Sequence, residues 1–173
     1  MDLAPTFEEV QRFNKWWHYL LAFFPFILIA LIFYSEWSGI IQQKPNQNPE
    51  TLRWIMIVTL GSTLLFSIWF VVLKLSTTIN SNGIETKFHF IPFCKRNITW
   101  EEIQSIQLIK YSPISDYGGW GVRYSISGKG WCYNVAGEHG IKITYKNGKQ
   151  FLIGTQQKEE AETIVQYFSQ KLK

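Results

Sequence analysis

The sequence predicts an α+β membrane protein, in which a two-helix transmembrane hairpin precedes a partly open antiparallel β-barrel capped by a C-terminal helix. Two long apolar runs without charged residues occupy residues 16–34 and 54–73. From residue 75 the pattern changes to short alternating segments rich in β-branched residues, which are interrupted by Asn-Gly turns. A helical period returns in residues 158–172. These three observations define the fold class.

Composition supports this class and excludes several others. Of the 173 residues, 46% are apolar, 17% are aromatic and 17% are charged, whereas charged residues make up about 25% of an ordinary soluble domain. The abundance of aromatic residues excludes intrinsic disorder, and two Cys exclude a disulfide scaffold. Residues 1–73 carry 4 Lys or Arg against 5 Asp or Glu, while residues 74–173 carry 13 against 8. The apolar mass and the positive charge therefore lie in different halves of the chain.

Residues 1–15 are predicted to form an interfacial N-terminal segment. Thr6 and Glu9 have the spacing of a capping box, and Phe7, Val10 and Phe13 share one helical face. This pattern predicts a short helix that lies in the membrane interface before the first span. A simple N-terminal extension of the span is the alternative.

The spans are predicted at residues 16–34, of which 17 are apolar, and residues 54–73, of which 15 are apolar. About 20 helical residues cross the hydrocarbon core of a bilayer, which is about 30 Å thick. A buried core hairpin is disfavoured because Trp residues gather near the ends of both runs, as in an aromatic belt. These residues are Trp16, Trp17, Trp37, Trp54 and Trp69. A cleaved signal peptide is disfavoured by the long preceding flank and by the lack of an A-x-A-like site.

Between the spans, residues 35–53 are rich in Asn, Gln and Pro and are predicted to form a solvated loop. Basic residues near the membrane number four on the side of the termini and two in the loop. They are Arg12, Lys15, Lys74 and Lys87 against Lys44 and Arg53. This excess predicts a multi-pass protein of the cell membrane with both termini in the cytoplasm. Thr59, Thr63 and Ser67 form a stripe of small residues that another helix could approach, either the first span or a subunit partner.

Residues 74–173 are predicted to form the β domain. The predicted strands are residues 75–80, 84–90, 95–100, 103–111, 121–127, 132–137, 141–145 and 150–154. One slip in the alternation of residues 103–111 predicts a bulge or a late start of that strand. In residues 158–172, the positions of Ala161, Ile164, Val165, Phe168 and Leu172 follow a helical period. We expect this helix to plug the partly open barrel with its apolar face.

The two spans and several stretches of the second half resemble small bacterial membrane proteins that carry a C-terminal PH-like (pleckstrin-homology-like) domain. The stretches are TTINSNGIETKFHFIPF, NITWEEIQSI, KYSPISDYGGWGVRYS, GKGWCYNV and GIKITYKNGKQFLIGTQ, of which GGWGVRY and FLIGTQ are the most specific. The PH-like part of the resemblance covers about residues 74–173. It implies the PH-like fold, but little about activity. One relative of this domain class protects its producer from a bacteriocin, which implies self-protection as a conceivable role.

PH domains that bind inositol phosphates do so through basic residues on their first two strands and the loop between them. Here that loop is residues 80–83, and Lys87 is the basic residue nearby. We therefore expect no phosphoinositide site. The basic residues of the second half are scattered rather than clustered, so acidic headgroups rather than nucleic acid are the expected counter-charge.

No catalytic, cofactor-binding or metal-binding residues are predicted. The three His lack metal-ligand spacing, and no G-x-S-x-G, Walker or GxGxxG motif occurs. The unusual segment is residues 111–124, in which three Gly surround one Trp. The candidate interaction loop comprises Asp116, Tyr117, Gly118, Gly119, Trp120, Gly121, Arg123 and Trp131, because Trp, Tyr and Arg are enriched at binding hot spots. The alternative is a structural β-bulge whose aromatic side chains cap the barrel, with Arg123 paired to Asp116.

The leading hypothesis is a non-enzymatic integral membrane protein, in which the PH-like domain is a cytoplasmic interaction or oligomerisation module. The expected partners are the lipid bilayer and a protein or second copy of the chain, and no cofactor is expected. Two alternatives remain open. One is membrane-associated small-molecule handling or catalysis at residues 111–124, and the other is immunity to a bacteriocin-like peptide.

Overall fold

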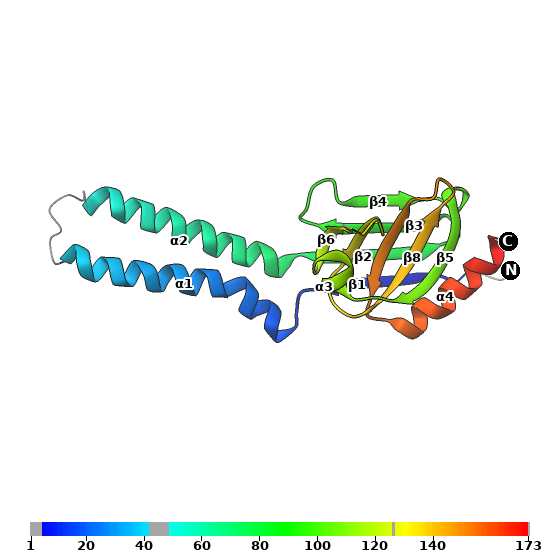
Figure 1. Cartoon of the computed structure of the whole chain (residues 1–173), viewed down its shortest axis with the longest axis horizontal. Coiled ribbons are helices and arrows are strands. Elements are labelled where there is room, and N and C mark those ends of the chain that lie inside the picture. The colour runs from blue at the N-terminus through cyan, green and yellow to red at the C-terminus, as the bar shows by residue number, and fades with distance from the viewer. Residues whose placement is uncertain (1–4, 42–48, 126, 173) are drawn as a thin grey trace. The chain divides into compact units, whose positions relative to one another are not determined.

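The structure, a computed structural model, describes residues 5–41, 49–125 and 127–172 (Figure 1). The chain divides into two compact units. Residues 13–72 form one unit, which we call the helical hairpin. The second unit combines the residues before 13 with residues 73–173, and we call it the sheet unit. The sheet unit is therefore discontinuous in sequence, because the helical hairpin is inserted between its first strand and the rest.

The helical hairpin consists of α1 (Trp16–Ile41) and α2 (Pro49–Val72). Both helices are long and apolar enough to cross a membrane, with 20-residue stretches at Trp16–Ser35 and Arg53–Val72. Only 11% and 6% of these stretches are buried inside the protein, so most of their apolar side chains lie on the surface of this chain. The Ser67 hydroxyl donates a hydrogen bond of 2.6 Å to the Ala22 carbonyl of α1. At Ser67, the stripe of small residues on α2 therefore faces the first helix of the same chain.

The predicted loop over residues 35–53 is wrong at both ends. Helix α1 continues to Ile41 and α2 begins at Pro49, while residues 42–48 lie outside the described part of the chain. Pro49 occupies the first position of α2, where its missing N–H has no helical partner in any case and its fixed φ suits a helix. Residues that look like loop by composition therefore extend both helices.

The predicted N-terminal helix is also wrong. Phe7–Arg12 forms strand β1, in which Phe7, Glu9 and Gln11 are buried while the residues between them are exposed. This strand pairs antiparallel with β2 (Lys74–Asn80), and Arg12 lies opposite Lys74. A backbone that pairs with another strand over its whole length cannot also form a helix, because the same N–H and C=O groups would be needed for both.

Sheet A contains four strands in the order β1-β2-β3-β4. Strands β2 and β3 (Gly83–His89) form the hairpin that the Asn-Gly pair predicts, and β4 (Lys95–Ile98) pairs with β3. In the β2–β3 turn, the Asn80 side-chain oxygen accepts a hydrogen bond from the Asn82 N–H at 2.8 Å. A side chain at Gly83 would collide with the Ile98 carbonyl, so glycine is required there.

Sheet B contains five strands in the order β5-β8-β9-β7-β6. Its strands are β5 (Ile103–Lys110), β6 (Gly121–Tyr124), β7 (Trp131–Asn134), β8 (His139–Tyr145) and β9 (Gln150–Thr155). A register shift between Ile103 and Ser105 confirms the predicted irregularity at the start of β5. Strand β7 runs parallel to β9, while the other pairs in the sheet are antiparallel. The predicted strands are therefore present, with β6 and β7 shorter than expected.

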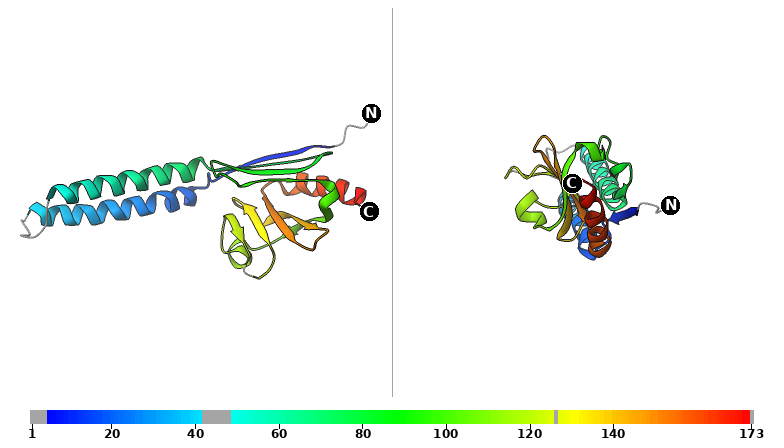
Figure 2. Two further views of the ribbon diagram at one scale, coloured as in Figure 1. Left: turned by 90° about the horizontal axis from the view of Figure 1, so that it is seen from above. Right: turned by 90° about the vertical axis from the view of Figure 1, so that its right-hand side faces the viewer.

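The two sheets do not close into a barrel, which corrects the predicted architecture. Strand β4 pairs with β3 in sheet A, β5 pairs with β8 in sheet B, and the short helix η1 (Trp100–Glu102) carries the chain from one sheet to the other. Residue pairs such as Phe88 and Tyr133, whose rings lie 5.8 Å apart, join the two faces. Seen from above, sheet B and α4 lie on the same side of sheet A (Figure 2). The domain is a pair of packed sheets.

Helix α4 (Lys158–Lys171) contributes the predicted apolar face to the core. Its buried residues are Ala161, Ile164, Val165 and Phe168, while Leu172 is half-buried beyond its end. The Phe168 ring stacks on Trp100 of η1 at 4.2 Å between ring centroids, and the Trp100 indole N–H donates to the Asn80 carbonyl at 2.9 Å. The helix is thereby fixed at the point where the chain passes between the sheets.

Candidate functional site

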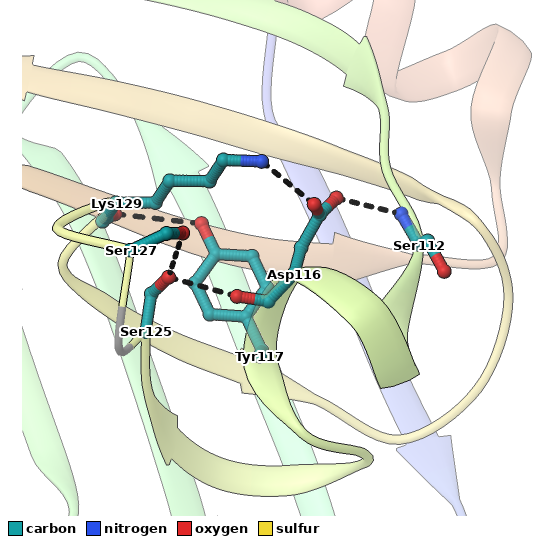
Figure 3. A network of polar contacts seen from close by, with 6 residues as sticks. All are labelled: Ser112, Asp116, Tyr117, Ser125, Ser127 and Lys129. Carbon is teal, nitrogen blue, oxygen red and sulfur yellow. Dashed lines mark hydrogen bonds and ion pairs between the residues drawn. The ribbon is translucent and has the colours of Figure 1, made fainter.

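The candidate loop begins with a single short helix, α3 (Pro113–Tyr117). Asp116 Oδ2 accepts a hydrogen bond from the Ser112 N–H at 2.9 Å, which fixes the start of the helix (Figure 3). The helix ends at Gly118, whose φ of 72° is left-handed, and the N–H of Gly119 donates to the Pro113 carbonyl. This is the hydrogen-bond pattern of a glycine-terminated helix. The first two glycines of the loop therefore end a helix.

Asp116 pairs with Lys129 rather than with Arg123, so the pairing expected for a structural loop is wrong. Lys129 Nζ lies 2.6 Å from Asp116 Oδ1. The hydrogen bond from Lys129 and the one from the Ser112 N–H together lower the pKa of the Asp116 carboxyl. Arg123 instead bends back along its own turn, where its Nε donates to the Trp120 carbonyl at 2.8 Å. Asp116 therefore holds the start of α3 and Lys129, whereas Arg123 stabilises the glycine turn around Trp120.

Tyr117 points into the protein rather than toward a partner surface. It is 7% exposed and belongs to a small core cluster with Tyr111, Cys132 and Leu152. Its ring meets the Tyr111 ring edge-on at 5.9 Å, and its hydroxyl reaches the Lys129 carbonyl at 3.4 Å. Burial raises the pKa of Tyr117 to about 12, so the hydroxyl stays protonated at neutral pH. Tyr117 anchors the loop on the end of sheet B.

A buried asparagine, which the sequence analysis did not single out, holds the glycine turn from below. Asn134 on β7 is fully buried. Its side-chain oxygen accepts from the Gly121 N–H at 2.9 Å, and its Nδ2 donates to the Tyr111 hydroxyl at 3.0 Å. The carbonyl of Gly119 lies 3.5 Å from the same Nδ2. One amide side chain therefore satisfies groups on both sides of Trp120, which makes the turn a fixed structure.

Two serines join the candidate loop to the β6–β7 connection. The buried Ser125 hydroxyl donates to the Asp116 carbonyl at 2.8 Å and lies 2.9 Å from the Ser127 hydroxyl (Figure 3). The β6–β7 connection also carries Lys129, which pairs with Asp116. Three polar residues of one connection therefore lie next to α3. The polar groups in Figure 3 bind one another or the backbone, which is what a structural network does.

The predicted aromatic residues divide between two environments. Trp120 is half-buried in the glycine turn. Trp131 on β7 is 42% exposed and meets Tyr124 of β6, itself 58% exposed, edge-on at 5.2 Å. These two rings border an open groove of about 510 Å³ whose other wall is the β8–β9 turn at residues 147–150. Lys149 stands at this groove. The exposed aromatic surface therefore lies on β6 and β7. It combines Trp131, which the sequence indicates, with Tyr124, which the sequence analysis did not single out.

Within the described residues, no group of three or more His, Cys, Asp or Glu is placed to hold a metal ion. Cys132, the thiol next to the site, is fully buried, and burial raises its pKa far above the ordinary value. Such a thiol is a poor nucleophile. A comparison of the chain with protein-family models, curated proteins and solved structures finds no match.

Proposed function

We propose that this chain is a non-enzymatic integral protein of the cell membrane, in which α1 and α2 span the bilayer and the sheet unit is a cytoplasmic interaction or oligomerisation module. The observation that carries the proposal is the pairing of β1 with β2. Strand β1 precedes α1 and strand β2 follows α2, so a spanning hairpin returns the chain to the side from which it left. The apolar, outward-facing side chains of both helices suit a lipid environment.

A PH-like character of the sheet unit is part of this proposal. Two packed, mostly antiparallel sheets followed by a C-terminal helix support it. Two features depart from a simple domain of residues 74–173, namely the added strand β1 and the parallel pairing of β7 with β9. The β2–β3 turn also lacks basic residues at positions 80–83. The proposed module therefore recognises something other than an inositol phosphate.

The surface we propose for a protein partner is the groove beside Tyr124 and Trp131. Exposed aromatic side chains are common anchors of protein interfaces, because they bury a large area at a small entropic cost. Strand β6 also lies at an edge of sheet B and so presents backbone groups to a further strand. In contrast, the polar residues of Figure 3 are occupied by one another. This division supports binding at the aromatic surface rather than catalysis at Asp116.

Labelling of single cysteines in intact cells tests the topology. One cysteine is introduced as Gln47→Cys, at a position between α1 and α2 in the sequence. The other is introduced as Asn147→Cys, in the exposed β8–β9 turn. A membrane-impermeant maleimide is expected to label position 47 from outside and to reach position 147 only after lysis. Cys94→Ser removes the native thiol that is partly exposed, while Cys132 is buried. Labelling of position 147 in intact cells, with position 47 protected, would reverse the proposed orientation.

Cross-linking in native membranes tests the interaction role. A photo-reactive residue at position 124 is expected to capture a specific protein, or a second copy of this chain. Trp131→Ala should reduce the yield, because it removes the neighbouring ring. The matched control is Ile114→Ala, which removes another exposed apolar side chain (65% exposed) outside the groove. Equal yields from both variants would remove the groove from the proposal.

A further inference from the structure

The β3–β4 connection presents exposed phenylalanine side chains at one end of sheet A. Phe93 is 100% exposed and Phe90 is 62% exposed, and both have a positive φ, of 68° and 65°. Such a conformation is rare and unfavourable for a bulky side chain. The connection is closed by a hydrogen bond of 2.8 Å from the Phe88 N–H to the Cys94 carbonyl. Two strained backbone positions thus hold the mostly exposed side chains of Phe90 and Phe93 on the surface of the sheet unit.

The strand register places this connection at the end of the sheet from which the helices leave. His89, the last residue of β3, pairs with Lys74, the first residue of β2, and Lys74 pairs in turn with Arg12, the last residue of β1. Only residue 73 separates β2 from α2, and residues 13–15 separate β1 from α1. Neighbouring strands lie about 5 Å apart. Strand pairing therefore places residues 90–93 at the same end of sheet A at which the chain continues into both proposed spans.

The same end of the sheet is positively charged. Residues 10–15, 74–76 and 87–95 contain five Lys or Arg and no Asp or Glu, namely Arg12, Lys15, Lys74, Lys87 and Lys95. The next residue, Arg96, instead lies over the Phe151 ring of sheet B at 4.9 Å. Lys95 is paired with Glu85 at 2.7 Å, and its two partners are each about half exposed. Burial lowers the pKa of His89, and Lys74 and Lys87 lower it further. The ring is thus neutral at pH 7, and the charge of this end comes from Lys and Arg.

We propose that residues 90–93 form a membrane-contact loop, in which Phe93 and Phe90 enter the interface of the bilayer while the surrounding basic residues meet anionic headgroups. This inference rests on the proposed membrane insertion of α1 and α2. An apolar tip ringed by basic residues matches the layered chemistry of a bilayer surface, which is apolar below and anionic above. The loop fixes the sheet unit against the membrane at a third point, in addition to its two covalent connections.

Spin labels on the full chain in nanodiscs of phosphatidylcholine and phosphatidylglycerol test the loop. A nitroxide is placed at Phe93→Cys, at Asn82→Cys or at Leu65→Cys, each with Cys94→Ser. Position 82 is the matched control, because it is exposed in the turn at the opposite end of the β2–β3 hairpin. Position 65 on α2 is 69% exposed and reports insertion of the span. The measured quantity is the accessibility of each label to oxygen relative to a water-soluble nickel chelate.

Lipid contact is expected to give a ratio at position 93 that is several-fold higher than at position 82 and that approaches the ratio at position 65. A high ratio at position 65 with equal, low ratios at positions 93 and 82 would overturn the loop and leave the spans in place. Low ratios at both 65 and 93 would overturn the membrane proposal and the loop with it. Reduced access of both reagents at position 93 would indicate a protein contact, which also contradicts a lipid-facing loop.

Discussion

Glu9 Oε2 accepts a hydrogen bond of 2.8 Å from the Thr155 hydroxyl, although 146 residues separate the two in the sequence. Both residues are buried. Glu9 Oε1 also accepts from the Gln156 N–H at 2.7 Å, and the neighbouring Gln11 side chain donates to the Gly154 carbonyl at 2.5 Å. Strand β1 belongs to sheet A, whereas Gly154 and Thr155 end β9 of sheet B. The N-terminal strand therefore joins the two sheets.

The buried carboxyl of Glu9 predicts a pH dependence. Burial raises the pKa of Glu9, an effect that the hydrogen bonds from Gln156 and Thr155 reduce. The folded protein then binds this proton more tightly than the unfolded chain, so the contribution of Glu9 to stability is greatest below the ordinary pKa of glutamic acid. That contribution is lost as the pH rises through the raised pKa of the folded state. Relative to Glu9→Gln, the wild-type free energy of unfolding should fall over this range.

Urea unfolding in detergent micelles, measured at a series of pH values from mildly acidic to mildly alkaline, checks this expectation. Glu8→Gln is the control, because Glu8 lies on the exposed face of β1, and it should keep the wild-type pH profile. Parallel profiles for wild type and Glu9→Gln would show that Glu9 does not titrate in the folded protein over this range.

Asn134→Ala should destabilise the sheet unit. It leaves the half-buried Gly121 N–H and the buried Tyr111 hydroxyl without the hydrogen bonds that Asn134 provides, and a buried polar group left unpaired costs about 1–3 kcal/mol. Trp131→Ala removes a side chain that is 42% exposed and should cost about 1 kcal/mol or less. Thermal unfolding of both variants gives the comparison. A larger loss of stability for Trp131→Ala than for Asn134→Ala would contradict this expectation. It would mean that the exposed aromatic pair stabilises the sheet unit more than Asn134 does.

Phe168→Ala should lower the free energy of unfolding by about 3–5 kcal/mol, as large aromatic truncations in cores do. Phe168 is 3% exposed and loses its stacking on Trp100 in this variant. Gln166→Ala on the exposed face of α4 is the control and should stay within about 0.5 kcal/mol of wild type. Chemical denaturation of the full chain measures both. A loss below about 1 kcal/mol for Phe168→Ala would mean that this face of α4 is not part of the core.

The local signals in the sequence predicted most elements but not the strand that joins the sheets. The Asn-Gly hairpins, the two apolar helices and α4 depend on neighbouring residues, and each is present in the structure. An ordinary half-buried strand buries apolar residues and exposes polar ones. Strand β1 instead buries Glu9 and Gln11 and exposes Val10. Its burial depends on hydrogen bonds to residues 154–156, and a local pattern contains no information about them.

The candidate loop shows the same division. Its glycines indicate a turn, and the structure places Gly118 and Gly119 at the end of α3. The ion pair with Lys129 and the support from Asn134 could not be read from spacing, because both come from the following β6–β7 segment. The sequence pattern did not predict the exposure of Phe90 and Phe93 for another reason. In sequence they continue an apolar strand, and only the turn after His89 directs them outward.

The most direct test of the discontinuous sheet unit is the stability of two shortened chains without the helical hairpin. In one, residues 5–12 are joined by a short Gly-Ser turn to residues 73–173, because Arg12 and Lys74 already lie opposite each other. The other consists of residues 73–173 alone. We predict that the joined chain unfolds cooperatively and is more stable by about 3 kcal/mol or more, the loss expected when the buried Phe7 alone is removed. Equal unfolding free energies for the two chains would contradict the account.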